Sequence, residues 1–246
     1  MKLFDPCGCF PTGRHYPGIA HLIIVRVSGV ADELDPDAAW APMRVAFIDV
    51  ETTGTDPKLD RVIEIAIVIG ERGEVMTRHT WLMNPERPIS KESTEVHGIR
   101  DEDVADKPTF AALASEIAGV LRGLLPAAYN ASFDRAFLHA EMDRAGYEDA
   151  EPAPAIRRKV TWIDPLVFAR EIFKGQGESR ALGAVAERLG VSLERAHRAT
   201  DDAEAALKVL YELSKDTRMP LTYAALVQEQ RRLERLQLDA QRFWRK

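Results

Sequence analysis

The sequence has little cysteine, no long apolar run and no excess of basic residues. Its two cysteines, Cys7 and Cys9, lie too close together for a useful cross-link and cannot build a disulfide framework. No apolar run reaches the roughly 20 residues that span a bilayer, and the first residues do not resemble a secretory signal. These absences exclude a disulfide-rich scaffold and a membrane bundle, and we expect a cytoplasmic protein with no membrane partner.

The charge balance is slightly acidic, with 39 acidic and 33 basic residues in a chain of 246. The net charge of −6 offers no basic field over the whole surface for nucleic acid. This absence is weak evidence, because carboxylates that hold divalent cations can face phosphate groups while the net charge stays negative. The apolar content of 46% is that of an ordinary globular protein, large enough for one domain with appendages.

Three parts differ in composition along the chain. Residues 1–42 hold five of the 14 prolines and four of the 15 glycines, and we predict a loosely ordered N-terminal extension there. Residues 43–215 carry all the motifs described below, so a chain beginning at Met43 is expected to fold and to keep its activity. Residues 216–246 are predicted to be a C-terminal helical tail.

The hydrophobic pattern of residues 43–215 predicts a mixed sheet flanked by helices. Strands are expected at residues 44–50, 61–70 and 74–82, which form an antiparallel meander with a turn at residues 71–73. Helical periods and short apolar runs then alternate, with helices at 109–125, 133–145, 166–173, 181–189 and 201–213 and strands at 126–129 and 160–163. A meander followed by strands that alternate with helices indicates an α/β fold whose later strands are parallel.

Acidic residues gather at the ends of these predicted elements. Asp49 and Glu51 stand two apart at the end of a strand, so their side chains share one face of the sheet. Alone they are typical of a polar strand end, just as Asp134 and Asp202 are typical of first-turn acids that a helix dipole favours. The occurrence of all these acids at element ends changes the interpretation, because the functional site of an α/β sheet forms at strand ends and helix starts.

His197 precedes Asp202 by five residues, which on a continuous helix is a rotation of about 140°. We therefore expect His197 in a loop and Asp202 in the first helical turn, with both side chains directed into one cleft. Several carboxylates in one cleft cost several kcal/mol if they are desolvated without cations. Ligands that are all oxygen select Mg²⁺ or Mn²⁺ rather than zinc, and two such ions about 4 Å apart stabilise the attacking and leaving oxygens of phosphodiester hydrolysis.

Four segments of the sequence resemble the DEDDh 3′→5′ exonucleases, a family with a ribonuclease H-like fold. The segments are FIDVETTG at 47–54, VHGI at 96–99, NASFD at 130–134 and HRATDD at 197–202. The likeness is greatest to the epsilon proofreading subunit of bacterial DNA polymerase III and extends over residues 43–213. It implies a metal-dependent exonuclease that releases nucleoside 5′-monophosphates from 3′ ends of single-stranded or frayed DNA, in proofreading or repair.

The resemblance also implies roles for individual residues. The ligands of two Mg²⁺ ions, for which Mn²⁺ can substitute, would be Asp49, Glu51, Asp134 and Asp202. His197 would be the general base for the attacking water, a task that suits an unperturbed pKa of about 6.5. Asp201 has the wrong register and is expected to be a neighbour of the site.

The nucleotide pocket implied by the resemblance comes from three segments. The backbone of Thr52, Thr53 and Gly54 would lie against the terminal nucleotide, where glycine permits a close approach. His97, Asn130 and Phe133 would complete the pocket, although Phe133 is equally typical of a core aromatic residue. The sequence has Thr55 where many relatives have leucine, which puts in doubt a hydrophobic wedge between the last two bases.

Two other functions stay open at this stage. An exoribonuclease that trims RNA 3′ ends would use the same chemistry, whereas a catalytically idle polymerase accessory module would be expected to have lost a ligand, and none is missing. The tail adds a further question, because it has a helical face formed by Leu226, Leu233, Leu236, Ala240 and Phe243. That face either docks a partner such as a DNA polymerase subunit, packs on the domain's own core, or belongs to a solvated basic helix.

Overall fold

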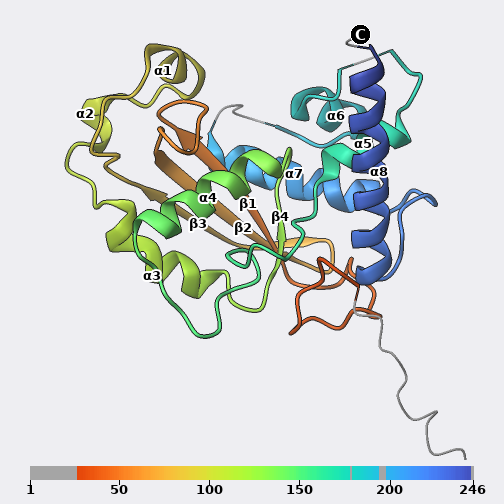
Figure 1. The fold of residues 1–246 in the computed structure, drawn as a ribbon. Helices are drawn as coiled ribbons and strands as arrows, with labels where there is room; N and C mark the ends of the chain where they lie inside the picture. The colour runs from red at the N-terminus through yellow and green to blue at the C-terminus, as the bar shows by residue number, and fades with distance from the viewer. Residues whose placement is uncertain (1–26, 178, 194–197, 245–246) are drawn as a thin grey trace, which may run out of the picture.

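A computed structural model describes residues 27–177, 179–193 and 198–244 of the chain (Figure 1). Its centre is a four-stranded sheet in the order β3-β2-β1-β4. The strands are β1 (Val45–Thr52), β2 (Val62–Glu71), β3 (Glu74–Leu82) and β4 (Leu125–Ala127). The pairs β1–β2 and β2–β3 are antiparallel and β1–β4 is parallel, which confirms the predicted α/β class with a meander first.

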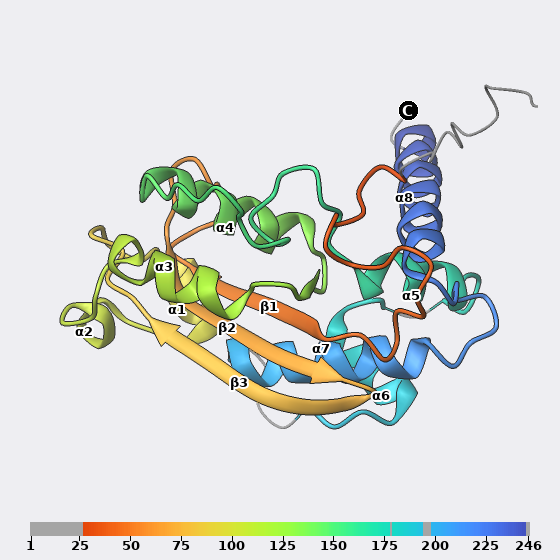
Figure 2. The same ribbon diagram turned by 90° about the horizontal axis from the view of Figure 1, so that it is seen from below.

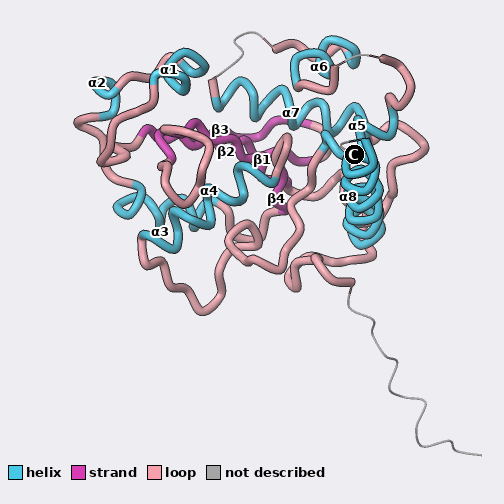
Figure 3. Tube along the Cα trace, turned by 45° about the horizontal axis from the view of Figure 1, so that its top comes forward, coloured by secondary structure: helices cyan, strands magenta, loops and turns pink. Residues whose placement is uncertain are grey.

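Helices cover both faces of this sheet. They are α1 (Lys91–His97), α2 (Asp101–Val104), α3 (Phe110–Val120), α4 (Ser132–Arg144), α5 (Pro165–Ile172), α6 (Leu182–Leu189), α7 (Ala199–Leu213) and α8 (Tyr223–Trp244). Figure 2 shows α3 and α4 on one side of the sheet and α7 on the other, and Figure 3 shows α5 and α8 side by side. Among the described residues, no helix is long and apolar enough to cross a membrane.

The alternation of side chains along β1 divides the core into two parts. Val45 and Phe47 join the cluster that α5, α6, α7 and α8 cover. Ala46 and Ile48 point the other way, into the cluster that α3 and α4 cover. Because successive strand residues face opposite sides, Asp49 continues the row that faces α7.

The structure departs from the expected secondary structure at two places. Residues 160–163 do not form a fifth strand, because only Ile163 makes a bridge to β4, while the Thr161 N–H donates to the Gly29 carbonyl instead of to a neighbouring strand. Helices α1 and α2 were not predicted. Helix α1 nevertheless begins at the capping residue Ser90 and ends at Gly98, which adopts the left-handed conformation common at helix ends.

The described part of the N-terminal segment is packed against the domain, contrary to the expected loose order. Trp40 is 1% exposed and its indole N–H donates to the Pro220 carbonyl at 2.7 Å. Backbone bonds also join this segment to the start of α8, for example from the Tyr223 N–H to the Ala38 carbonyl. A high content of proline and glycine therefore gives an irregular but ordered path over residues 27–42, because the segment covers apolar side chains. Residues 1–26 lie outside the described residues.

The apolar face of α8 is used within the chain along its first half. Leu226 is fully buried and Leu233 is 3% exposed, and both belong to the core cluster on the α7 side of the sheet. Leu236 and Leu238, further along the helix, are 53% exposed. Of the three alternatives for this face, packing on the domain's own core therefore applies to Leu226 and Leu233.

Candidate active site

Strand β1 carries the first two acids of the site at its carboxyl end. Asp49 and Glu51 follow Val45 and Phe47 on the face that α7 covers, as the period of two predicted. Both side chains are partly buried. The strand thus delivers two carboxylates to the space between its own end and the first turn of α7.

Helix α7 supplies the third acid from its first turn. Carboxylate oxygens of Asp49, Glu51 and Asp202 all lie within 4.8 Å of one another. Asp201 is also in the first turn of α7 but is not part of this group. His197, the predicted general base, lies outside the described residues.

Asp134 approaches the same end of β1 from the opposite helix layer. It lies in the first turn of α4, is 4% exposed, and its Oδ1 accepts a hydrogen bond of 3.1 Å from the Val50 N–H. This bond falls on the residue between Asp49 and Glu51. The four predicted metal ligands therefore meet at one strand end, brought there by three elements.

The electrostatics of the cluster favour a cation. Burial raises the pKa of Asp49 well above its usual value, and Asp134, Glu51 and Asp202 raise it further. Burial likewise raises the pKa of Asp134 and raises that of Glu51 to about 7, with Glu64 and Asp202 as additional causes. Partly desolvated carboxylates at this spacing repel each other unless positive charge joins them. The donor set is all oxygen, so the residues fit a hard divalent cation.

Glu64, which the sequence analysis did not single out, adds a fifth carboxylate beside this cluster. It pairs with Glu51 across the β1–β2 ladder and is 2% exposed. Its Oε1 lies 3.6 Å from a guanidinium nitrogen of Arg198, and its carboxylate accepts the Ala199 N–H. Because Ala199 is the first residue of α7, Glu64 ties the start of that helix to the sheet close to Asp202. The one signal in the sequence was an acid inside an otherwise apolar strand.

A tight turn follows the two acids of β1. The Thr52 hydroxyl donates to the Gly54 carbonyl at 2.6 Å, and the Thr53 hydroxyl donates to Asp60 at 3.2 Å. A Cβ on Gly54 would come within 2.4 Å of the Asp60 carboxylate, so only glycine leaves room for that side chain. The close approach that glycine permits within this structure is thus to Asp60.

His97 joins α1 to the end of β1. Its Nδ1 accepts the Ile99 N–H at 3.1 Å, which leaves the proton on Nε2, and Nε2 lies 3.3 Å from the Thr52 carbonyl. Burial lowers the pKa of His97. The side chain is therefore a neutral imidazole that holds helix α1 against the Thr52–Gly54 turn.

The loop before α4 is held by a second acid that the sequence analysis missed. Asp164 is 7% exposed and accepts the N–H groups of Asn130 and Ala131 at 3.0 Å and of Leu166 at 2.9 Å. Asn130 has a φ of 64°, a left-handed conformation that asparagine tolerates. An aspartate directly before Pro165 is a typical start of a helix and could have been recognised in the sequence. Its bonds to the distant loop could not.

Phe133 is half-buried, so its position is compatible both with the nucleotide pocket and with the apolar core. Its ring packs against Phe137 at a centroid distance of 4.8 Å, next to the apolar cluster under α3 and α4. The adjacent Asn130 is exposed. The structure thus places Asn130 in the loop before α4 and Phe133 in the first turn of that helix, next to Asp134 and on the side of the acids opposite α7.

Comparison with known proteins places this fold and acid cluster in a family. The family model RNase_T, described as "Exonuclease", matches residues 46–210, and the chain belongs to this exonuclease family. It is 32% identical over 168 residues to the DNA polymerase III subunit epsilon of Treponema pallidum, an alignment that covers 67% of this chain and 74% of that protein. The match confirms the family expected from the four motifs.

Two further similarities cover a smaller part of the related protein. The chain is 32% identical over 192 residues to the PolC-type DNA polymerase III of Thermotoga maritima; the match covers 78% of this chain but 13% of that protein. The structure of Escherichia coli exonuclease I in complex with a dT13 oligonucleotide superimposes with a TM-score of 0.60 at 20% identity, over 70% of this chain and 41% of that one. The similarity to exonuclease I establishes a shared fold. This chain is an exonuclease domain, and its acidic site is suited to a divalent metal.

Proposed function

We propose that this protein removes nucleotides from the 3′ ends of DNA with the help of two Mg²⁺ ions, for which Mn²⁺ can substitute. The observation that carries the proposal is the meeting of the carboxylate oxygens of Asp49, Glu51 and Asp202 within 4.8 Å, next to the buried carboxylate of Asp134. The 3′→5′ direction and the preference for DNA rest on the resemblance of the motifs to DEDDh enzymes. The products would be nucleoside 5′-monophosphates.

In this proposal Asp49, Glu51, Asp134 and Asp202 would hold the cations. Bound there, divalent cations supply positive charge that stabilises the attacking and leaving oxygens of the scissile phosphodiester. His197 would accept the proton of the attacking water. The chain's own contribution is to fix the carboxylates, which it does through backbone bonds such as that from Val50 to Asp134.

The terminal nucleotide would bind beside these acids. Thr52, Thr53 and Gly54 would present their backbone to it, and the exposed Asn130 and half-buried Phe133 would contact it from the other side. His97 would act indirectly, because its ring nitrogens face the backbone of Thr52 and Ile99. Its removal should therefore loosen the turn that receives the nucleotide.

Association with a DNA polymerase subunit is a further part of the proposal, supported by the polymerase III relatives. The exposed part of α8 that contains Leu236 would be the contact. A cytoplasmic location follows from the same replication role. Binding of the purified chain to a polymerase catalytic subunit, with and without Leu236→Glu, would test the contact.

The proposed reaction is tested with substrates labelled at either end. Single-stranded DNA, single-stranded RNA, a duplex with a mismatched 3′ end and closed circular DNA are incubated with the protein in Mg²⁺ and in EDTA. We expect mononucleotides to be released from DNA with a free 3′ end, and only when Mg²⁺ is present. Release of label from the 5′ end first, internal cutting of the circle, or unchanged activity in EDTA would refute the proposal. Faster digestion of RNA than of DNA would establish the exoribonuclease alternative.

A further inference from the structure

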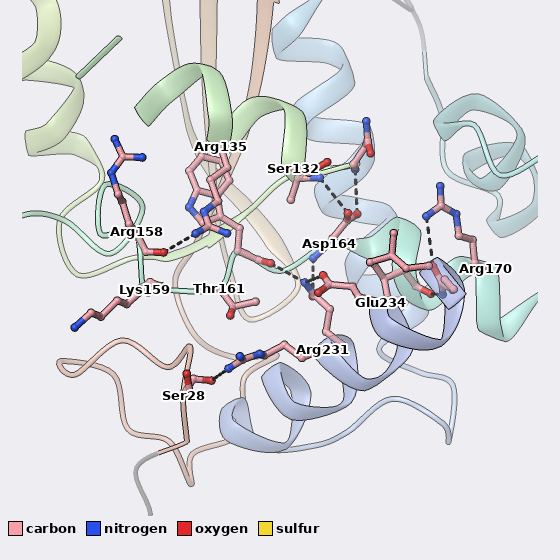
Figure 4. Close-up of a pocket in the computed structure, with 18 residues that line it drawn as sticks. Ser28, Ser132, Arg135, Arg158, Lys159, Thr161, Asp164, Arg170, Arg231 and Glu234 are labelled. Atoms are coloured by element: carbon pink, nitrogen blue, oxygen red, sulfur yellow. Dashed lines mark hydrogen bonds between the residues drawn. The ribbon is translucent and has the colours of Figure 1, made fainter. Parts of the chain in front are cut away.

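A second concave surface lies next to the acid cluster and has the opposite charge. It is a groove of about 640 Å³, large enough for a ligand-binding site, between the loop before α4, residues 158–162 and the exposed side of α8 (Figure 4). Two of its walls are far apart in the sequence but are joined by Gln230 of α8. The Gln230 side chain accepts the Asp164 N–H and donates to the Trp162 carbonyl, each at 2.9 Å. Hydrogen bonds of the folded domain therefore hold these two walls of the groove together.

Basic side chains dominate the lining of this groove. Five of them come from four segments, namely Arg135, Arg158, Lys159, Arg170 and Arg231. The acids of the lining are Asp164, which accepts backbone N–H groups, and Glu234, which accepts the Gln230 amide. Arg158 is also paired with Asp143, which does not line the groove. A local excess of positive charge in a chain of net charge −6 indicates an anionic ligand.

The groove and the acid cluster share the loop before α4. Asn130, Ala131 and Ser132 line the groove, whereas Asp134, two residues further on, faces β1 and the acids. Arg135 then returns to the groove and donates to the Arg158 carbonyl. A chain of phosphates that leaves the acid cluster over this loop would meet the basic side chains directly.

We propose that this groove binds the phosphodiester backbone of the substrate strand on the 5′ side of the terminal nucleotide. This inference rests on the proposed function and deepens it. Each basic side chain in contact with phosphate releases counterions from the nucleic acid, so the groove would provide affinity that does not depend on base sequence. The acids would act on the last nucleotide while the groove holds the strand that follows.

The test removes two cations of the groove. Lys159 and Arg170 are exposed, and neither forms an ion pair within the described part of the chain. Lys159→Ala/Arg170→Ala is compared with Arg44→Ala/Lys215→Ala, which removes the same charge from exposed positions outside the groove. Binding of a fluorescent single-stranded oligonucleotide is measured in EDTA by anisotropy over a series of salt concentrations.

For two lost contacts, the slope of log affinity against log salt should become smaller by about 1.4, since each contact contributes about 0.7 on single strands. Near 0.1 M salt this corresponds to about 25-fold weaker binding, while the control variant should bind like wild type. Equal effects of the two variants would overturn the proposal. A loss seen with a 5′-overhanging duplex and absent with the single strand would also overturn it, because the groove would then hold the second strand.

Hydrolysis of thymidine 5′-monophosphate p-nitrophenyl ester separates this proposal from the proposed function. The ester carries one phosphate and cannot extend into the groove, so the groove variant should keep the wild-type rate on it. If wild type hydrolyses neither ester nor oligonucleotide, the proposed function fails, and the binding data in EDTA still decide about the groove. A groove variant that loses activity on the ester as strongly as on the oligonucleotide would contradict a role in strand binding.

Discussion

Replacement of Trp40 by alanine tests whether the segment before β1 belongs to the fold. Trp40 is 1% exposed and belongs to the same core cluster as Phe47, two residues before Asp49. Its indole N–H donates to the Pro220 carbonyl, and its backbone N–H donates to the Leu221 carbonyl at 3.2 Å. The substitution would leave a cavity between β1 and the start of α8.

The expected loss is large for a domain of this size. Replacing a buried tryptophan by alanine typically reduces the free energy of unfolding by about 3–5 kcal/mol. For chains of 150–250 residues each kcal/mol lowers the melting temperature by about 2–4 °C, so a decrease of roughly 6–20 °C is expected. A chain beginning at Met43 loses Trp40 together with the backbone bonds to α8, and should be affected at least as much. This prediction is opposite to the expectation from the sequence that such a chain would be stable.

The measurement is thermal unfolding followed by circular dichroism, with Leu221→Ala as the matched control. Leu221 is 79% exposed and accepts the Trp40 N–H through its backbone, so its side chain can be shortened without loss of a buried contact. We expect the control to change the free energy of unfolding by less than about 0.5 kcal/mol. A Trp40→Ala protein that melts within 2 °C of the control would show that the segment is dispensable.

Four further predictions concern the site. Asp49→Asn should lower turnover at least ~10²-fold by disrupting the cation site, and Asp201→Asn should keep most of the rate; equal damage would show that the register is wrong. His197→Ala should lower the rate by roughly 10²- to 10⁴-fold while Mn²⁺ binding, measured by calorimetry, is kept. Without metal, the folded state should lose stability as pH rises from about 4.5 to about 7, because the unfolded chain ionises Glu51 first; Mg²⁺ should therefore raise the melting temperature more at pH 8 than at pH 5.5. Asp164→Ala leaves three backbone N–H groups without their acceptor and should cost about 3 kcal/mol or more in urea unfolding, whereas Asp164→Asn, which keeps one acceptor oxygen, should cost less.

The elements with a strong hydrophobic period could be predicted from the sequence to within a few residues. Strand β2 was expected at residues 61–70 and spans Val62–Glu71, and α7 was expected at 201–213 and spans Ala199–Leu213. Both bury a continuous set of apolar side chains, so the pattern carries the information. Helix α1 has no such period, since its seven residues bury only His97, and its signals were limited to the caps at Ser90 and Gly98.

Burial of the N-terminal segment could not be predicted, because its partners are distant in the chain. Trp40 meets Pro220 across 180 positions, and the Ala31 N–H meets the Tyr223 hydroxyl across 192. A single tryptophan in a segment without hydrophobic periodicity does not indicate which surface its side chain covers. Composition predicted loose order, but a backbone without regular secondary structure is compatible with tight packing when a core is available to cover.

The candidate ligands were found from their motifs, whereas the residues that hold them in place depend on the tertiary fold. Asp134 accepts the Val50 N–H between the two acids of β1, and Glu64 accepts the N–H of the first residue of α7. Asp164 performs the same task for the loop that precedes α4. In each case a buried carboxylate fixes the start or end of an element that carries another carboxylate. Such an arrangement aligns the carboxylates closely but concentrates negative charge, so a cation bound there should also stabilise the folded domain.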